Sequence, residues 1–549
     1  MSKNDQAYRA TTMGPNGMIT TPHYLASQAG MNVLQNGGNA IEAAIAAAST
    51  ISIVYPHMNS IGGDNFWLIY NAKTNKVKAL NSSGRSGENA SISFYKEKGY
   101  NKIPSRGYLS ANTVPGAVAG WGEAYRYAKD HLSCTYSWKE LLRAAISYAK
   151  NGFAVTHSQE HWTKVNINEE DSEFRYLHRF DEFKKTFLKP DGSLYKKGEV
   201  LKQPDLANTL ELIASEGSKA FYEGEIARKI VDDLQANGGL LTLNDFKKHR
   251  SNWVDPISVA YKGYTAYNLP PNTQGMASLS ILNILNNFDF STIEEGSKEY
   301  YHLLIEATKL AFKDRDQWLT DPDFVDIPLD DLLSKSHGME LAHQINSNFS
   351  KEMEKKLDPK GDTVWFGVVD KEGNAVSFIQ SIYHDFGSGI IPKQTGILLQ
   401  NRGSFFSLDE NNVNSLEPNK RTFHTLNPAM LLKENAPYLV YGTMGGEGQP
   451  QTQAALVTRI LDYRFDVQAA IEAPRWLYGR TWGASSNNLK IESRVPSEVI
   501  QALESLGHDI EVVEEFTDVM GHAGAILIDE HNVKRGGADP RGDGLALGY

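Results

Sequence analysis

Apolar residues follow two different spacings in the first part of the chain. Residues 25–35 carry apolar positions at helical spacing, and Asn36-Gly-Gly-Asn39 has the turn formers that end one helix and begin another. Residues 40–55 are almost uninterruptedly apolar, but this run of about 16 residues is shorter than the roughly 20 that cross a bilayer. The pattern therefore predicts two packed helices, the second one buried.

Beyond these helices the spacing becomes that of strands. Residues 66–70 and 76–80 are rich in β-forming residues and flank a polar turn, which predicts a hairpin. From about residue 138 to residue 346 the apolar period is mainly helical. Residues 330–362 lose that period, and the charged stretch 351–362 ends in turn formers, which is typical of an exposed linker.

The linker is followed by a second predicted hairpin. Two β-rich runs, residues 363–370 and 374–383, flank Lys371-Glu-Gly373, a three-residue loop with glycine at its third position. Counting back from this turn pairs Thr363 with Ser381, and opposed residues have Cβ atoms about 4.5–5.5 Å apart. Their hydroxyl groups are expected to lie close together.

A threonine at the start of a strand after a cleavable linker is what an N-terminal nucleophile needs. Scission of the Asp362–Thr363 bond would give Thr363 a free α-amine next to its own hydroxyl. An α-amine has a pKa of about 7.7–8, so it can act as a base without a histidine. The alternative is that Thr363 is simply a β-branched residue that begins a strand.

A glycine-rich turn offers a place for an oxyanion. Residues 438–442 read as a buried strand, Gly445 and Gly446 follow it, and a helix is expected from Gln451. Adjacent glycines before a helix leave backbone N–H groups available to an anion. A phosphate-binding loop would need a following Gly-Lys-Ser/Thr or a GxGxxG spacing, and both are absent from the sequence.

The amino-acid composition indicates which kinds of molecule the protein binds and which it does not. The 549 residues carry 55 Lys and Arg against 66 Asp and Glu, a net charge of -11, which argues against nucleic acid and anionic membranes and favours a small-molecule substrate. The single cysteine excludes an intrachain disulfide and a thiolate metal cluster. The polar amino terminus lacks the apolar core of a secretory signal, so the cytoplasm is expected.

Taken in order, several segments resemble the gamma-glutamyltranspeptidase family of N-terminal nucleophile hydrolases, and the resemblance covers almost the whole chain. Within the family the sequence is most similar to the oxamate amidohydrolase and cephalosporin-acylase-like branch. The segments are residues 36–44, 61–66, 114–121, 306–312 with 321–322, Thr363 with 368–375, 445–446 and 539–541.

The resemblance implies an α+β fold, a four-layered αββα sandwich with extra helices. It also implies a precursor that cleaves itself before Thr363 into a large subunit, residues 1–362, and a small subunit, residues 363–549, which form one intertwined globular unit. Ser381 matches the family's second hydroxyl, and the amides of Gly445 and Gly446 match its oxyanion hole. No cofactor or metal is implied.

The substrate-binding motifs depart from those of the gamma-glutamyl enzymes. The family's binding arginine has no clean counterpart, because Ser83 occupies its position and Arg85 follows two residues later. The segment that normally holds a glutamyl α-ammonium through an acid here reads Asn401-Arg402-Gly-Ser-Phe405, so Phe405 replaces the acid. The family's Ser-Ser pair is His424-Thr425, and Tyr383 replaces an asparagine.

Loss of a carboxylate and gain of an arginine reverse the local charge. The pocket is therefore expected to prefer an acyl group that carries an anion and no ammonium, such as an oxalyl, glutaryl or succinyl amide. The alternative is that Arg402 pairs with an internal acid such as Asp409. True gamma-glutamyltransferase or glutathione hydrolase activity, and a noncatalytic, unprocessed relative that binds an anionic metabolite, remain open.

Four histidines are further candidates for site residues. His157 and His161 are four residues apart, but no third ligand accompanies them, so a metal site is not predicted. His384 and His424 lie in the proposed site region, where each either contacts substrate or has a structural role.

Overall fold

Two antiparallel seven-stranded sheets lie face to face at the centre of the protein. The structure is a computed structural model, and it describes residues 6–168, 174–345, 362–479 and 488–549. Sheet A has the order β1 (Thr12–Gly14), β18 (Lys534–Ala538), β17 (Ala523–Ile528), β13 (Ala436–Thr443), β12 (Ala429–Lys433), β9 (Tyr264–Asn268) and β8 (Ile257–Tyr261). Sheet B has the order β19 (Leu545–Gly548), β2 (Met18–Thr21), β10 (Asp362–Val369), β11 (Ala375–Tyr383), β3 (Asp64–Asn71), β4 (Lys76–Ser82) and β7 (Asn252–Val254).

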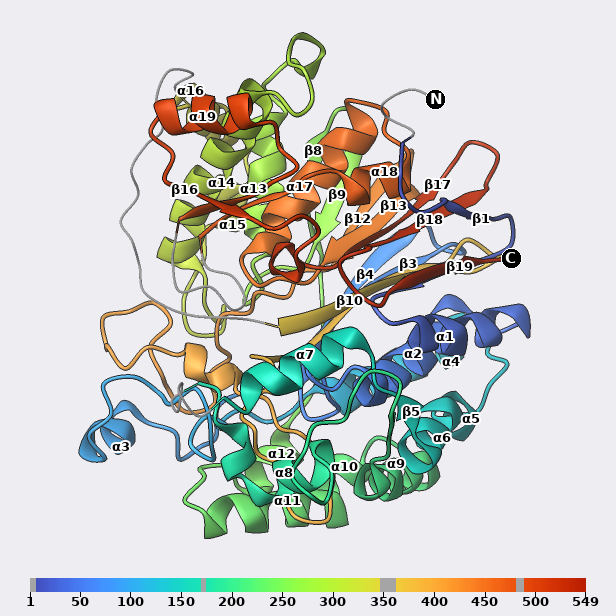
Figure 1. Cartoon of the computed structure of the whole chain (residues 1–549), viewed down its shortest axis with the longest axis vertical. Helices are drawn as coiled ribbons and strands as arrows, with labels where there is room; N and C mark the ends of the chain where they lie inside the picture. The colour runs from blue at the N-terminus through green and yellow to red at the C-terminus, as the bar shows by residue number, and fades with distance from the viewer. Residues whose placement is uncertain (1–5, 169–173, 346–361, 480–487) are drawn as a thin grey trace.

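A helical layer covers the outer face of each sheet (Figure 1). Sheet B packs against α1 (Tyr24–Gln35), α2 (Ala40–Val54) and α4 (Ala117–His131). Sheet A packs against α13 (Gly275–Leu285), α17 (Gly448–Leu461) and α18 (Val467–Glu472), and α14 (Lys298–Trp318) lies on α13 and α17. The protein is therefore the predicted αββα sandwich, with one apolar core between the sheets and one under each helical layer.

Extra helices and two small sheets surround the sandwich. The helices are α3 (Ile92–Glu97), α5 (Trp138–Leu141), α6 (Arg143–Asn151), α7 (His157–Asn166), α8 (Asp181–Phe187), α9 (Pro204–Glu216), α10 (Ala220–Glu223), α11 (Glu225–Ala236), α12 (Leu243–Lys248), α15 (Leu329–Leu332), α16 (Lys335–His343), α19 (Ser497–Ser505) and the 3-10 turns η2 (Leu177–Arg179), η3 (Phe290–Thr292), η4 (Arg402–Phe405) and η5 (Asp518–Met520). The small sheets are β5 (Phe153–Ala154) with β6 (Val200–Leu201), and β14 (Trp476–Tyr478) with β15 (Leu489–Glu492) and β16 (Ile510–Val513).

The predicted elements of the first hundred residues are confirmed. Helices α1 and α2 and strands β3 and β4 match the expected ranges to within a few residues. The middle third is mainly helical, as predicted, but residues 252–268 within it form β7, β8 and β9 at the ends of the two sheets. These three strands have only three to five residues each, so they show little of the period-two pattern that predicts a strand. Helices α15 and α16 occupy the start of the predicted linker, and residues 346–361 lie outside the described residues.

The turn of the β10–β11 hairpin is tied to the amino end of α2. The Asp370 carboxylate accepts hydrogen bonds from the backbone amides of Asn374, at 2.8 Å, and of Ala40, at 3.0 Å. Asn39 caps the same helix end in a capping box with Glu42. The helix dipole favours a negative charge at this end. One end of the hairpin is thereby fixed to the helical layer.

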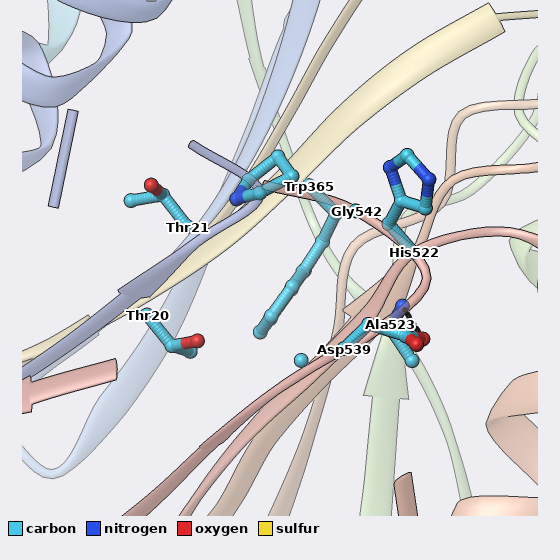
Figure 2. Close-up of a pocket in the computed structure, with 9 residues that line it drawn as sticks. Thr20, Thr21, Trp365, His522, Ala523, Asp539 and Gly542 are labelled. Atoms are coloured by element: carbon cyan, nitrogen blue, oxygen red, sulfur yellow. Dashed lines mark hydrogen bonds between the residues drawn. The ribbon is translucent and has the colours of Figure 1, made fainter. Parts of the chain in front are cut away.

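Trp365 fixes the other end of β10 from within the sandwich. Its indole lies between Thr20 and Thr21 on β2 and the β17 side of sheet A, beside a cavity of about 10 Å³ (Figure 2). The indole Nε1 donates to the Ser377 hydroxyl at 2.9 Å. Gly442 and Gly524, which pair with each other in sheet A, leave room for the ring. This packing sets the depth at which β10 begins.

We expect Gly524→Ala to destabilise the protein. The new Cβ would lie 2.6 Å from Cζ3 of Trp365, and overpacking of this kind costs about 1–3 kcal/mol. The urea midpoint should fall accordingly. In a Trp365→Leu background the same substitution should cost less, since the ring is absent; an equal cost in both backgrounds would contradict the role of the indole.

Candidate functional site

The register of the β10–β11 hairpin follows the prediction up to its last step. Val369 pairs with Ala375, and the pairing continues without interruption to Val364 with Gln380. The strands then shift register, so that Asp362 pairs with Tyr383 and Thr363 lies at the irregularity. Gly373 has the positive φ of 85° expected in the turn. Thr363 and Ser381 thus belong to the same end of the hairpin, but the bulge replaces their direct pairing.

Alternation along the two strands places this end of the hairpin between the sheets. Trp365 and Ile379 belong to the core between the sheets, whereas Val364 belongs to the core under α1 and α2. By the period of two, Ser381 is on the same face as Ile379, and Thr363 lies at the bulge opposite this end of β11. Both are buried in the uncut chain, in which the Asp362–Thr363 bond is intact.

Ser381 holds the backbone where β11 ends. Its hydroxyl accepts a hydrogen bond from the Tyr383 amide at 2.8 Å. Tyr383 has a φ of 82°, which is uncommon for a residue with a bulky side chain and is maintained by surrounding contacts. Its ring stacks on His384, with the centroids 4.3 Å apart, and contacts Phe405. This backbone conformation directs Tyr383 into the cluster around Arg402.

Arg402 is fully buried, and no carboxylate among the described residues forms an ion pair with it. Its guanidinium lies 4.3 Å from the centroid of the Tyr383 ring. It donates to the hydroxyl of Ser381 at 3.3 Å and, at 3.5 Å, weakly to that of Thr425. Nε has no partner in the described part of the chain. Asp409 is exposed and makes no contact with Arg402, so the pairing considered from the sequence is not formed.

A buried carboxylate–imidazole pair lies beside this arginine. Asp64 is next to Ser381 across the β3–β11 ladder, and one of its oxygens accepts from the amides of Gly84 and Gly116, each at 3.0 Å. The other oxygen lies 3.0 Å from Nε2 of His424. Burial raises the pKa of Asp64 to about 6, and burial followed by the charge of Arg402 lowers the pKa of His424 well below its usual value. At neutral pH a neutral His424 therefore donates Nε2–H to ionised Asp64.

The glycine turn after β13 is held beside the His424–Thr425 segment. The side-chain amide of Gln274 donates to the carbonyls of Gly446, at 2.8 Å, and of Thr425, at 2.7 Å. Gly445 and Gly446 have φ values of 114° and 55°. Within the described residues no acceptor takes a hydrogen bond from either glycine amide. Helix α17 begins at Gly448, three residues before the predicted start.

Asn401 has a positioning contact on the other side of Arg402. Its side chain accepts from the His384 amide at 3.0 Å, lies 2.8 Å from Nδ1 of the same histidine and donates to the Ser105 carbonyl. His384 is therefore held by Asn401 and stacked on Tyr383. Both residues belong to the wall that supports the cluster.

Arg85, the remaining predicted substrate-binding residue, has its contacts elsewhere. It forms ion pairs with Asp321, at 2.8 Å, and with Asp323, and it donates to the Asn419 carbonyl. No hydrogen bond or ion pair joins it to Ser381, Arg402 or Thr425 in the described part of the chain. The structure thus brings together Ser381, Tyr383, Arg402, His424 and Thr425, and leaves Arg85 in a separate pocket.

Two residues of the site had no sequence signal of their own. Gln274 joins the glycine turn to the Thr425 segment, and Arg315 donates to Gln274 at 3.2 Å and to Glu447 at 2.9 Å. Both are far from the hairpin in the sequence. The position of Asp64 in one of the family-like segments was the only available indication of a role for that residue.

One cluster has ligand types suited to a metal ion. Potential ligand atoms of His302, Glu306 and His508 all lie within 4.8 Å of one another. Nδ1 of His302 lies 2.8 Å from Nε2 of His508, and Lys309 forms an ion pair with Glu306 at 2.8 Å. The cluster is thus engaged in contacts among its own members and with a lysine.

His157 and His161 share α7, as expected from their spacing.

The chain is similar to known proteins over almost its whole length. The family model described as Gamma-glutamyltranspeptidase matches residues 26–549. The chain belongs to the gamma-glutamyltranspeptidase family. It is 48% identical over 540 residues to a glutathione hydrolase-like YwrD proenzyme of Bacillus subtilis (strain 168), with 98% of this chain and 99% of the relative covered. It is 42% identical over 540 residues to an oxamate amidohydrolase proenzyme of Klebsiella pneumoniae, with 98% and 100% covered.

A solved structure supports the same placement. The crystal structure of cephalosporin acylase from Bacillus halodurans matches with a TM-score of 0.90 and 36% identity, covering 99% of this chain and 98% of that one. The predicted family, branch and fold are confirmed. The protein is an enzyme of the amide hydrolase and acyltransferase class to which this family belongs. None of the described helices is long and apolar enough to span a bilayer.

The raised pKa of Asp64 predicts a pH-dependent contribution to stability. Between pH 4 and pH 6 the unfolded chain releases the Asp64 proton while the folded chain keeps it, so this residue lowers stability as pH rises. Relative to Asp64→Asn, the wild type should lose about 2 kcal/mol of unfolding free energy from pH 4 to pH 7. Urea titrations at several pH values measure this difference; a difference independent of pH would contradict the assignment.

Proposed function

We propose that Thr363 is an N-terminal nucleophile released by self-cleavage of the Asp362–Thr363 bond. The proposal rests on membership of the gamma-glutamyltranspeptidase family and on the position of Thr363 at the end of the hairpin, near Ser381. Both of the relatives described above carry the word proenzyme in their names. The products would be a large subunit of residues 1–362 and a small subunit of residues 363–549.

The chemistry is acyl transfer. The α-amine of Thr363 takes the proton of its own hydroxyl, and the oxygen attacks the amide carbonyl of the substrate. The N–H groups of Gly445 and Gly446 stabilise the resulting oxyanion, since they have no competing acceptor among the described residues. The amine leaves with a proton, and water then hydrolyses the threonyl ester. Ser381 supports the nucleophile from the adjacent strand.

The substrate is the amide of a small anionic acyl group, such as oxamate or a glutaryl amide. The observation that carries this proposal is the buried guanidinium of Arg402, which has no carboxylate in contact among the described residues. Burial lowers the pKa of Arg402 to about 10, so the charge persists at neutral pH and is available to a substrate carboxylate. Thr425 and Tyr383 contact the guanidinium, Asn401 holds the neighbouring His384, and the Asp64–His424 pair lies beside the arginine.

Glutathione hydrolysis is the second candidate, favoured by the name of the Bacillus subtilis relative. A glutamyl group carries an α-ammonium, which requires an acid. Phe405 stands where the gamma-glutamyl enzymes have that acid, and its ring packs against Phe423 with the centroids 4.5 Å apart. This apolar contact favours the anionic acyl amide.

Substitution of Thr363 tests the nucleophile. Thr363→Ala should remain a single band near 61.0 kDa on a denaturing gel and should release no ammonia from oxamate. The wild type should give fragments of about 40 and 21 kDa, in proportion to 362 and 187 of the 549 residues. Thr363→Ser is the matched control, because it keeps a hydroxyl and should still be processed. A wild type that stays uncut, or a Thr363→Ala variant with full turnover, would refute the proposal.

Substitution of Arg402 tests the substrate class. Arg402→Gln should lower kcat/KM for oxamate by at least about 30-fold, since removing one partner of a buried charge pair costs roughly 2–5 kcal/mol. Arg143→Gln, on an exposed position of α6, is the control and should leave kcat/KM unchanged. Faster turnover of a gamma-glutamyl p-nitroanilide than of oxamate by the wild type would favour the glutathione hydrolase alternative.

A further inference from the structure

A polar pocket lies at the segment that carries Arg85 and Ser86. Its volume is about 200 Å³, and its wall includes Arg85, Asp245, Lys248, His249, Arg250 and Arg421. It shares no residue with the cluster of Ser381, Arg402 and Thr425. The volume is below that of pockets that take drug-sized ligands, so a small ligand is expected.

Cations outnumber acids among the residues that line this pocket. Four cationic side chains face one acid, Asp245. Both oxygens of Asp245 are occupied: one accepts from the Glu88 amide at 2.9 Å, and the other from Thr242 at 2.8 Å. Arg85 is paired with Asp321 and Asp323, and Lys248 with Glu88 at 3.3 Å. Arg250 and Arg421 are therefore the two lining cations that form no ion pair within the described residues.

Arg421 is the buried member of this set. It is 6% exposed, and its guanidinium donates to the Ser83 carbonyl at 3.2 Å and to the Asn252 side chain at 2.6 Å. Asp321 forms its ion pair with Arg85 and accepts the backbone amide of Arg421, at 2.7 Å, rather than its guanidinium. Among the described residues no carboxylate pairs with the Arg421 side chain. A buried cation in this situation is stabilised by an anionic ligand.

Two neighbouring residues, Arg250 and His249, also lack an anionic partner among the described residues. Arg250 donates to the carbonyls of Lys247 and His249 and forms no ion pair within the described residues. Nε2 of His249 is buried and has no hydrogen-bond partner in the described part of the chain. The His249 imidazole lies flat on the Tyr222 ring, 5.2 Å between centroids, which fixes its orientation. A bound oxyanion would supply an acceptor for both residues.

We propose that this pocket binds a small oxyanion with two negative charges, held by the guanidinium groups of Arg250 and Arg421 and by the ammonium group of Lys248. Inorganic phosphate and a short dicarboxylate share this chemistry, and guanidinium groups match both in geometry. The inference does not depend on the proposed activity, because it concerns binding at residues outside that site.

Calorimetric titration of the full-length protein with phosphate, and separately with malonate, in a chloride buffer tests the proposal without any turnover. The wild type should bind at least one of these ions saturably. Lys248→Gln with Arg250→Gln should weaken that binding at least tenfold. The matched control is Lys247→Gln with Arg228→Gln, which removes the same charge from exposed positions outside the pocket. The tighter of the two ions identifies the class of ligand.

Two results would overturn the proposal. One is a wild-type dissociation constant above about 10 mM for both ions, which is too weak for a specific site. The other is equal affinity of the two double variants, which is also the result expected if the ion binds at Arg402. Equal thermal unfolding midpoints check that both double variants are folded. If the double variant Lys248→Gln with Arg250→Gln unfolds, two single variants, Arg250→Gln and Arg250→Lys, are compared instead. Arg250→Gln should weaken ion binding, and Arg250→Lys, which keeps the positive charge, should retain more of it.

Discussion

The pairing of β10 with β11 is the constraint on which the candidate active site depends. The Asp370–Asn374 turn is fixed to the amino end of α2, and from there backbone hydrogen bonds determine every opposed pair along the hairpin. At the far end this register brings Thr363, Ser381 and Tyr383 to one place. The next strand, β3, adds Asp64 opposite Ser381. A slip of one residue would move these side chains to the other face of the sheet.

Burial decides the electrostatics of this end of the sandwich. Arg402 is close enough to lower the pKa of Asp64, yet loss of solvation has the larger effect and the pKa of Asp64 rises. The same burial lowers the pKa values of His424 and Arg402. Asp64 is compensated by two backbone amides and an imidazole, whereas Arg402 has aromatic and hydroxyl contacts. Of these groups, Arg402 is therefore the one that an anionic ligand would stabilise most.

Much of the fold could be predicted because its signals are local. The apolar run that became α2, the alternating strands β3 and β4, and the glycine turn at Gly373 each express a period or a turn type within about 20 residues. The bulge at Thr363 could not be predicted, because it arises where the strand end meets other elements rather than from its own sequence. Strands β7, β8 and β9 were missed because they are short and lie at or near the ends of their sheets.

The sequence by itself determined the family, the αββα class, the hairpin that carries Thr363 and Ser381, and the replacement of an acid by Phe405. Tertiary structure alone decided which cations meet which acids. Arg85 and Arg402 are both arginines near family motifs, but one is paired with Asp321 and Asp323 and the other lies on Tyr383 with no acid in contact within the described residues. Ion pairing depends on distances of a few ångströms between segments hundreds of residues apart, and neither composition nor periodicity encodes those distances.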